Sequence, residues 1–258
     1  VAVLSATKTA LSERYGADDI LTYVISIVNG GPAPYTGLTM TDDLGAYTYG
    51  TGTLTPLTYV DGSLRYFVNG VLQATPTPTA DAPLTVPGIA VPAGGNALLI
   101  YETRVNSFAP LDTESTVTNT ATLSGAGLTT PVQAASTVNA RAAAYLTIGK
   151  AVSPATVAEN GTLTYTFTIQ NYGNTAAAET DNVTVSDTFS PILKAISVTY
   201  NGVAWTEGTQ YTYNAATGAF ATTAGQITVP AASMTRDAAT GAVVVTPGIS
   251  TLTVTGTV

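Results

Sequence analysis

The sequence predicts an all-β protein built from two tandem domains. It contains 24 glycines and 14 prolines, it is rich in threonine and valine, and no segment carries a long helical apolar stripe. This composition favours many short strands joined by turns. An internal repeat gives the domain organisation, because four residues recur 142 positions later (146 − 4): Leu4, Lys8, Tyr23 and Asn29 return as Leu146, Lys150, Tyr165 and Asn171. We expect domain one over residues 1–141 and domain two over residues 142–258.

Alternating apolar residues predict the strands of domain one. These lie at Val3–Lys8, Leu21–Asn29, Leu38–Asp42, Leu64–Val68, Ala97–Val105, Ser115–Leu123 and Val132–Asn139. Asn69-Gly70 predicts a tight hairpin turn after the fourth of them. Asn201-Gly202 stands at the corresponding place in domain two, which supports the repeat independently of the lysines.

Domain two shows the same pattern but ends earlier. Its predicted strands lie at Leu146–Lys150, Leu163–Gln170, Val183–Asp187, Ala242–Val245 and Thr251–Val258. The near-copies at 214–219 and 237–242 are predicted to be short hairpin loops. Residues 98–105 align with 251–258, so the strands that follow in domain one have no counterpart in domain two. We therefore expect the second domain to lack its last strand or strands in this sequence. Because an open sheet edge is costly, either the natural chain is longer or another copy fills the gap.

Composition and charge exclude several classes of function. The net charge is −8 and the eight basic residues are scattered, so we expect no nucleic-acid partner. Cysteine and histidine are both absent, which removes disulfides, thiolate chemistry, most zinc sites and the usual proton shuttle. Asp18-Asp19 and Asp42-Asp43 lack the spacing of a calcium loop. We therefore expect no enzyme activity, no metal and no cofactor, and without a run of 18 apolar residues we expect no membrane span in this segment.

Strand alternation points three polar side chains toward an apolar interior. Lys8 is in phase with Leu4, and Asp42 is in phase with Leu38. Asn119 is in phase with Val117, whereas the threonines at 116, 118, 120 and 122 alternate with them and face outward. Domain two repeats two of the three, because Lys150 is in phase with Leu146 and Ile148, and Asp187 is in phase with Val183 and Val185.

Buried polar groups of these three types can react with one another. An unpaired buried charge is strongly penalised, and burial lowers the pKa of a lysine and raises that of an aspartate, so that both can be neutral. A neutral Lys8 amine could then attack the side-chain carbonyl of Asn119 while a protonated Asp42 polarises it and ammonia leaves. The product would be an intramolecular Lys–Asn isopeptide bond, with Asp42 as its promoter. The alternative is an ordinary buried salt bridge between Lys8 and Asp42, capped by Asn119.

The strings Ala6-Thr-Lys8, Met40-Thr-Asp42 and Val117-Thr-Asn119-Thr-Ala-Thr, with their equivalents in the second copy, resemble the bacterial cell-surface repeat called domain of unknown function 11. The resemblance implies Ig-like β-sandwich domains that occur in tandem in large exported bacterial proteins. It also matches Lys8, Asp42 and Asn119 to the isopeptide arrangement of Gram-positive pilins and collagen-adhesin domains. Domain two departs from the pattern because it has no asparagine at the required place.

Three outcomes are open for Lys150 and Asp187, the crosslink residue and promoter expected in domain two. Their partner asparagine could lie in further sequence, about 14 positions beyond Val258 by the spacing from 105 to 119 (119 − 105); a neighbouring molecule could supply it; or no bond forms. If a neighbouring copy completes the sheet, the protein would polymerise head to tail through added strands.

Together these features predict a structural subunit or segment of an extracellular bacterial surface fibre, stalk or surface layer. Low charge, threonine richness and the absence of cysteine fit an exported bacterial protein. The expected partner is another copy of the protein. The alternative function is an adhesin segment whose exposed loops bind a host protein or glycan, which would require a concave aromatic patch. An enzyme is retained only as a formal third class.

Overall fold

The computed structural model describes residues 3–258 and divides the chain into two compact units. Unit 1 comprises Val1–Arg141 together with Arg236–Val244, and unit 2 comprises Ala142–Thr235 together with Val245–Val258. Val1 and Ala2 of the predicted first domain lie outside the described residues. The protein is all-β apart from one short 3-10 helix, η1 (Glu179–Asp181).

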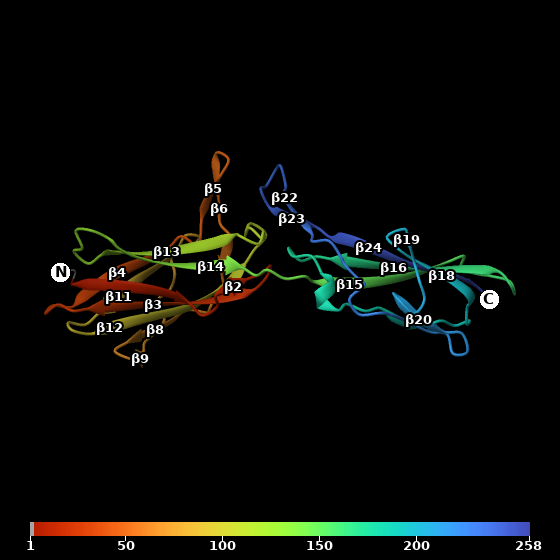
Figure 1. Cartoon of the computed structure of the whole chain (residues 1–258). Helices are drawn as coiled ribbons and strands as arrows, with labels where there is room; N and C mark the ends of the chain where they lie inside the picture. The colour runs from red at the N-terminus through yellow and green to blue at the C-terminus, as the bar shows by residue number, and fades with distance from the viewer. Residues whose placement is uncertain (1–2) are drawn as a thin grey trace. The chain divides into compact units, whose positions relative to one another are not determined.

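Unit 1 is a sandwich of two mainly antiparallel sheets (Figure 1). The first sheet has the order β1 (Leu4–Ala10), β3 (Ile20–Asn29), β12 (Asn96–Val105), β8 (Arg65–Val68) and β9 (Val71–Leu72), with β7 (Leu57–Tyr59) also paired to β12. The second has the order β10 (Ala80–Asp81), β11 (Leu84–Val91), β4 (Tyr35–Asp42), β13 (Thr116–Gly125), β14 (Val132–Ala140) and β2 (Arg14–Tyr15). A separate hairpin pairs β5 (Tyr47–Tyr49) with β6 (Gly52–Leu54).

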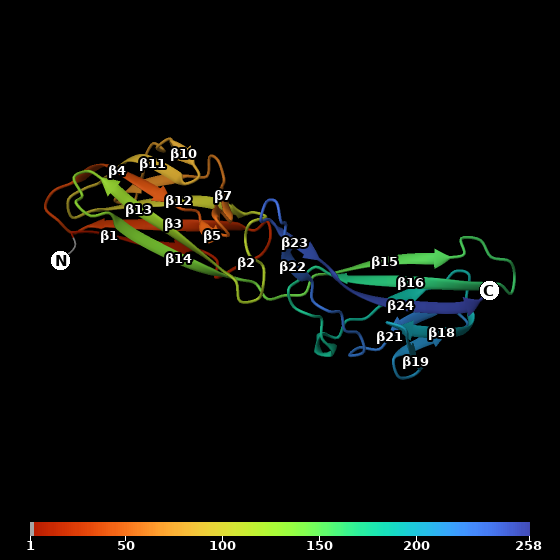
Figure 2. The same ribbon diagram turned by 90° about the horizontal axis from the view of Figure 1, so that it is seen from above.

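The core of unit 1 is formed by alternate residues of both sheets. On β3 the buried side chains are Leu21, Tyr23, Ile25 and Ile27, and on β4 they include Leu38 and Met40. This is the alternation that the sequence predicts for strands with one face on a core. The edge strand β1 lies beside β14 of the other sheet (Figure 2). The inward face of β1 is therefore covered.

Unit 2 has a five-stranded sheet with the order β15 (Leu146–Ser153), β16 (Thr162–Asn171), β24 (Gly248–Thr257), β18 (Lys194–Tyr200) and β19 (Val203–Trp205). Its second sheet has only three strands, β17 (Ser186–Thr188), β21 (Ala219–Thr222) and β20 (Tyr211–Asn214). A further hairpin pairs β22 (Ser233–Arg236) with β23 (Val243–Thr246), and its residues Arg236–Val244 belong to unit 1.

The register shows that the two units are built on one plan. Tyr23 of β3 faces Tyr101 of β12, and the repeated Tyr165 of β16 faces Val254 of β24. Asp42 of β4 faces Leu84 of β11, and Asp187 of β17 faces Phe220 of β21. Within residues 3–258, unit 2 has no counterpart of β13 or β14, as the sequence alignment predicted. The strand β17 consequently forms an edge of its sheet.

The predicted turns agree with the structure, whereas one predicted strand is displaced. Asn69-Gly70 and Asn201-Gly202 each adopt the two positive φ angles of a tight hairpin turn. The predicted strand Val183–Asp187 is wrong in its bounds, because β17 begins only at Ser186. The reason is local: Asn182 ends η1 in a left-handed conformation, so the chain cannot enter a regular strand until a few residues later.

Candidate functional site

The three polar residues predicted to point inward in unit 1 meet between its two sheets. Lys8 lies on β1 opposite Ile25, and its side chain is fully buried. Its Nζ lies 2.8 Å from Oδ2 of Asp42, which ends β4 in the other sheet and is also fully buried. The ion pair therefore spans the sandwich and joins its first strand to the opposite layer.

Asp42 is the centre of the cluster. Its Oδ2 accepts hydrogen bonds from Lys8, from the hydroxyl of Tyr101 and, at 3.4 Å, from Nδ2 of Asn119. Its Oδ1 accepts the backbone N–H of Leu44 at 2.8 Å, which closes the turn that ends the strand. Two side-chain partners on separate strands thus converge on the same carboxylate oxygen as the lysine.

Asn119 is placed beside Asp42 by the pairing of β13 with β4. Ala121 is the register partner of Asp42, so Asn119 lies two residues away on the same inward face. The side chain is fully buried, and its Oδ1 and the hydroxyl of the neighbouring Tyr23 both lack a hydrogen-bond partner among the described residues. A buried carbonyl left in this state costs about 1–3 kcal/mol. If the amide turned over, its carbonyl would face Asp42, which could donate to it only in the protonated form.

Burial lowers the pKa of Lys8, and the attraction of Asp42 opposes this shift without cancelling it. The rings of Tyr23 and Tyr101 lie 4.8 and 5.8 Å from its Nζ. The pKa of Tyr101 is raised well above its ordinary value, first by burial and second by the charge of Asp42. Tyr101 therefore remains a hydrogen-bond donor to the carboxylate at neutral pH.

The sequence analysis missed both tyrosine roles, although one left a signal. Tyr23 recurs as Tyr165, and each ring centroid lies 4.8 Å from the lysine Nζ of its own unit. The recurrence of tyrosine at this position therefore accompanies a recurring cation–π contact. Tyr101 left no such signal, because its equivalent in unit 2 is Val254 and a comparison of the repeats does not single it out.

In unit 2 the structure brings Lys150 and Asp187 together but does not bury them. The Lys150 Nζ lies 2.5 Å from Oδ2 of Asp187, and the two side chains are 43% and 20% exposed. Lys150 does point toward the core, since its Nζ lies 4.8 Å from the ring centroid of Tyr165 and 5.9 Å from that of Phe189, but the side chain is exposed where that of Lys8 is buried. Among the described residues, β17 reaches this face of β15 through Asp187, but no counterpart of β13 or β14 covers the rest of it.

The fourth repeated residue, asparagine, has a structural role in both units. Asn29 donates through Nδ2 to the carbonyls of Ala33, Val91 and Pro92, and its Oδ1 accepts the N–H of Gly31. Asn171 donates to the carbonyl of Thr175 and accepts from the N–H groups of Tyr145 and Gly173. Each side chain therefore fixes the loop that leaves its strand, β3 in unit 1 and β16 in unit 2.

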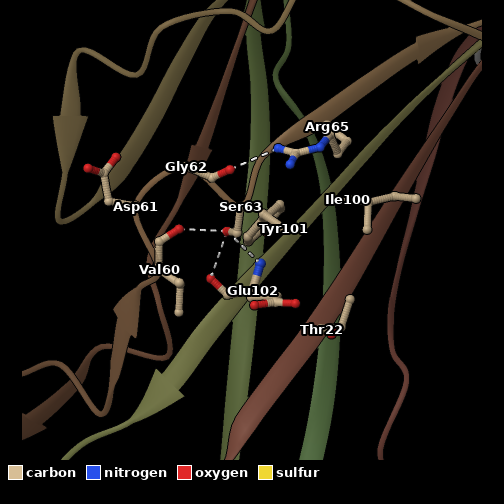
Figure 3. Close-up of a pocket in the computed structure, with 9 residues that line it drawn as sticks. All are labelled: Thr22, Val60, Asp61, Gly62, Ser63, Arg65, Ile100, Tyr101 and Glu102. Atoms are coloured by element: carbon tan, nitrogen blue, oxygen red, sulfur yellow. Dashed lines mark hydrogen bonds between the residues drawn. The ribbon is translucent and has the colours of Figure 1, made fainter.

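Unit 1 also carries an open depression of about 440 Å³ between the loop at 60–65 and strands β3 and β12 (Figure 3). The Ser63 hydroxyl donates to the carbonyl of Val60 at 2.6 Å and accepts the N–H of Glu102 at 3.0 Å. The one aromatic residue of the lining, Tyr101, is fully buried. This depression therefore does not present the concave aromatic patch that the adhesin hypothesis requires.

Within residues 3–258, no three histidine, cysteine, aspartate or glutamate side chains are grouped so that they could hold a metal ion. In the same residues, no helix has the length and apolar character needed to cross a membrane. Asp43, one of the acidic residues considered for calcium, instead accepts the N–H groups of Gly45 and Thr120 through Oδ1, each at 2.9 Å.

Comparison with known proteins gives a general likeness without a family. No protein-family model matches the chain, and no curated protein matches it. The pilus backbone protein RrgB from Streptococcus pneumoniae overlaps 95% of this chain at 10% identity with a TM-score of 0.39, and the chain spans 55% of that protein. The collagen-binding domain of a Staphylococcus aureus adhesin overlaps 52% at 12% identity, with a TM-score of 0.32 and 96% of that domain covered. A family 123 glycoside hydrolase from Clostridium perfringens overlaps 54% at 8% identity, with a TM-score of 0.34 and 27% of its length. These similarities are weak, and the similar structures include both structural proteins and an enzyme. They therefore carry no argument about what this chain does.

Proposed function

We propose that the protein is a structural segment of an extracellular bacterial surface fibre, stalk or surface layer, whose first unit locks itself with a covalent bond between Lys8 and Asn119. The observation that carries the proposal is the buried cluster in which Lys8 and Asn119 share one oxygen of Asp42. An amine, an acid and an amide are held together there and are buried from solvent, which is the arrangement that such a bond requires.

The reaction balances within the cluster. The neutral Lys8 amine attacks the side-chain carbonyl carbon of Asn119, and a new C–N bond forms as the bond to the amide nitrogen breaks. Asp42, in its protonated form, polarises the carbonyl and then passes a proton to the departing nitrogen, which leaves as ammonia. The amine proton returns to Asp42, so the promoter is regenerated. Tyr101 positions the carboxyl by its hydrogen bond to Oδ2.

An ordinary salt bridge capped by Asn119 is the competing account of the same contacts. In that account the Oδ1 of Asn119 is buried without a hydrogen-bond partner. The lysine of the ion pair also has a pKa below its ordinary value, so it loses its proton more readily. Both features are costly in a static salt bridge and useful in a reactive cluster. The two accounts predict different covalent masses, so a single measurement separates them.

A bond at this place suits a segment under mechanical load. It ties β1, the first strand of the unit, to β13, near the end of the unit, and so closes a loop of 111 residues (119 − 8). Force applied through the ends of unit 1 would then act on a covalent bond instead of a ladder of hydrogen bonds. The sequence resemblance to the surface repeat, together with the absence of cysteine, supports an exported location in which this bond replaces a disulfide.

Intact mass spectrometry of the denatured protein tests the crosslink. We expect the chain to weigh one ammonia less than its sequence. Lys8→Ala and Asn119→Ala should each restore the full mass, and Tyr101→Phe should slow the loss without abolishing it. Lys194→Ala is the matched control, because Lys194 lies on β18 in unit 2 and should leave the loss unchanged. A wild-type chain of full mass would leave the ordinary salt bridge as the correct account.

A further inference from the structure

The hydroxyl of Tyr23 is buried in the reactive cluster of unit 1 without an assigned role. Tyr23 lies on β3 and is fully buried, and its ring centroid lies 4.8 Å from Nζ of Lys8 and 6.3 Å from the ring centroid of Tyr101. A phenylalanine would make the same ring contacts. The hydroxyl itself has no hydrogen-bond partner among the described residues. A buried donor without an acceptor is costly, so its place in the cluster calls for a reason.

The side-chain amide of Asn119 is the neighbour on which this hydroxyl can act. Burial raises the pKa of the Tyr23 hydroxyl well above its ordinary value, so the hydroxyl keeps its proton, and the adjacent amide of Asn119 opposes this shift. An amide lowers the pKa of a phenol by donating to its oxygen, so the nitrogen end of Asn119 faces both Tyr23 and, at 3.4 Å, Oδ2 of Asp42. The oxygen end, Oδ1, has no partner among the residues that the structure describes. An unpaired donor and an unpaired acceptor thus belong to two adjacent side chains.

Turning the Asn119 amide over brings the two unpaired atoms together. The oxygen and nitrogen ends of an amide have nearly the same size, so they exchange places by rotation about the last side-chain bond. The carbonyl oxygen then lies between the Tyr23 hydroxyl and the carboxyl group of Asp42. Both groups can donate to it, Tyr23 at neutral pH and Asp42 in the protonated form that the reaction uses. Two donors directed at one carbonyl oxygen form a site that stabilises an oxyanion.

We propose that Tyr23 is a catalytic residue of the crosslinking reaction, whose hydroxyl donates a hydrogen bond to the carbonyl oxygen of Asn119 and stabilises the negative charge that develops there as Lys8 attacks. The inference rests on the proposed Lys8–Asn119 bond and adds a group to its mechanism. A donor fixed in a buried site acts more strongly on such a charge than it would in water, and it needs no rearrangement at the moment of reaction.

The step leaves Tyr23 unchanged. As the Lys8 nitrogen bonds to the carbonyl carbon of Asn119, the π electron pair of the carbonyl moves onto its oxygen, where the hydrogen bonds from Tyr23 and Asp42 stabilise it. When this pair returns, the bond from the carbon to the original amide nitrogen breaks. Asp42 gives its proton to that nitrogen, which leaves as ammonia, and takes up one proton from the Lys8 amine. Tyr23 keeps its own proton throughout.

The two tyrosines of the cluster therefore have different tasks. The Tyr101 hydroxyl donates to Oδ2 of Asp42 and acts on the reaction only through that carboxyl group. The Tyr23 hydroxyl acts on the reacting amide itself. The repeat also separates the two positions, since unit 2 keeps a tyrosine beside its lysine as Tyr165 but has Val254 in the place of Tyr101.

Tyr23→Phe removes the hydroxyl and keeps the ring. The whole chain, kept unfolded since synthesis, is refolded at neutral pH, and the loss of ammonia is followed by intact mass spectrometry. We expect the rate to fall about 10²–10³-fold, the usual effect of removing one oxyanion donor. Tyr66→Phe is the matched control, because its hydroxyl bonds to the backbone of Ala90 and its removal should leave the rate unchanged. Tyr23→Phe should lower the rate equally at all pH values, whereas Tyr101→Phe should also shift the pH dependence, because that hydroxyl bonds to the acid.

Two further measurements separate the chemistry from folding. In chains that carry Asn119→Ala, where no bond forms, Tyr23→Phe should leave the urea midpoint of unit 1 unchanged, since the hydroxyl then has no partner to lose. In a chain with 3-fluorotyrosine at position 23 alone, the ring keeps nearly the same shape and its hydroxyl is a stronger donor. The rate of ammonia loss should therefore rise above that of the unmodified chain.

The outcomes separate this inference from the proposed function. A Tyr23→Phe chain that loses ammonia at the wild-type rate would overturn the catalytic role, and so would a fluorotyrosine chain no faster than the wild type. A slower loss accompanied by a lower urea midpoint in the Asn119→Ala chains would assign the hydroxyl to folding and overturn the role as well. The proposed bond would survive each of these results. A wild-type chain of full mass would instead overturn the bond itself, and with it the role of Tyr23.

Discussion

The expected reactivity of the Lys8 amine depends on its buried position beside Asp42. Burial lowers the pKa of its amine, and the neighbouring carboxylate opposes the shift without cancelling it. The reactive form, a neutral amine beside a protonated acid, carries the same number of protons as the ion pair. Moving the proton within the pair therefore requires no exchange with solvent.

This proton count predicts a bell-shaped pH dependence for the crosslinking rate. Above the lowered pKa of Lys8 the pair has lost the proton that the leaving ammonia requires, so the rate should fall with rising pH, beginning below lysine's ordinary value of 10.5. At low pH the amine of Lys8 carries a proton and cannot attack. The measurement is the loss of ammonia, followed by mass spectrometry, after chain kept unfolded since synthesis is refolded at a series of pH values.

A rate that rises continuously through pH 10.5 would contradict the role of Asp42, since an amine that reacts without the acid needs only to lose its proton. Asp42→Ala provides the control for the same experiment. We expect it to show no loss of ammonia at any pH, because the lysine then has neither a proton acceptor nor a polarising partner.

Among the elements, β3 in unit 1 and β16 in unit 2 each end in a buried asparagine that holds the following loop by hydrogen bonds. Asn29 ends β3 and Asn171 ends β16, and both are fully buried with hydrogen bonds to the loop that follows. The two side chains satisfy backbone groups that the turn would otherwise leave unpaired. The repeat therefore preserves a structural asparagine as well as a reactive lysine.

Replacing either asparagine by alanine should destabilise its own unit by about 1–3 kcal/mol, because buried loop groups lose their partners. Urea denaturation followed by hydrogen exchange in each unit measures the change. Gln170→Ala is the matched control in unit 2, since this neighbouring amide accepts a hydrogen bond from the exposed hydroxyl of Tyr172. We expect that change to stay within about 0.5 kcal/mol. Equal effects of Gln170→Ala and Asn171→Ala would contradict the structural role.

At the scale of the whole molecule, the two units are expected to differ in stability. Unit 1 has two complete sheets and the proposed crosslink, whereas unit 2 has a three-stranded second sheet with an open edge at β17. By analogy with a disulfide, a bond that closes a loop of 111 residues (119 − 8) removes unfolded-state entropy equivalent to about 4–5 kcal/mol.

Asn119→Ala should therefore lower the free energy of unfolding of unit 1 by about that amount while leaving unit 2 unchanged. The variant keeps the Lys8–Asp42 ion pair, so the loss reports the covalent bond more directly than Lys8→Ala, which would also leave a buried carboxylate unpaired. Denaturation monitored separately in the two units gives the measurement. A change of less than about 1 kcal/mol in unit 1 would be inconsistent with a closed bond in the wild type.

Some features of the fold left clear signals in the sequence and others did not. Leu84–Val91 forms β11, but Pro87-Gly88 interrupts its alternation, and the structure accommodates both residues in a register shift between Val86 and Ile89. The strand was therefore not predicted. Val183–Asp187 shows the converse, because its alternation suggests a strand that the local turn at Asn182 delays.

The repeat, the tight turns and the inward direction of Lys8, Asp42 and Asn119 can be predicted from the sequence, because they follow from spacing and from the two-residue period of a strand. The packing of the two sheets was needed to show that the three side chains meet at one carboxylate, that Tyr101 joins them, and that Lys150 is exposed. Alternation along a strand fixes only the face on which a side chain lies. What lies opposite that face depends on which strand packs against it.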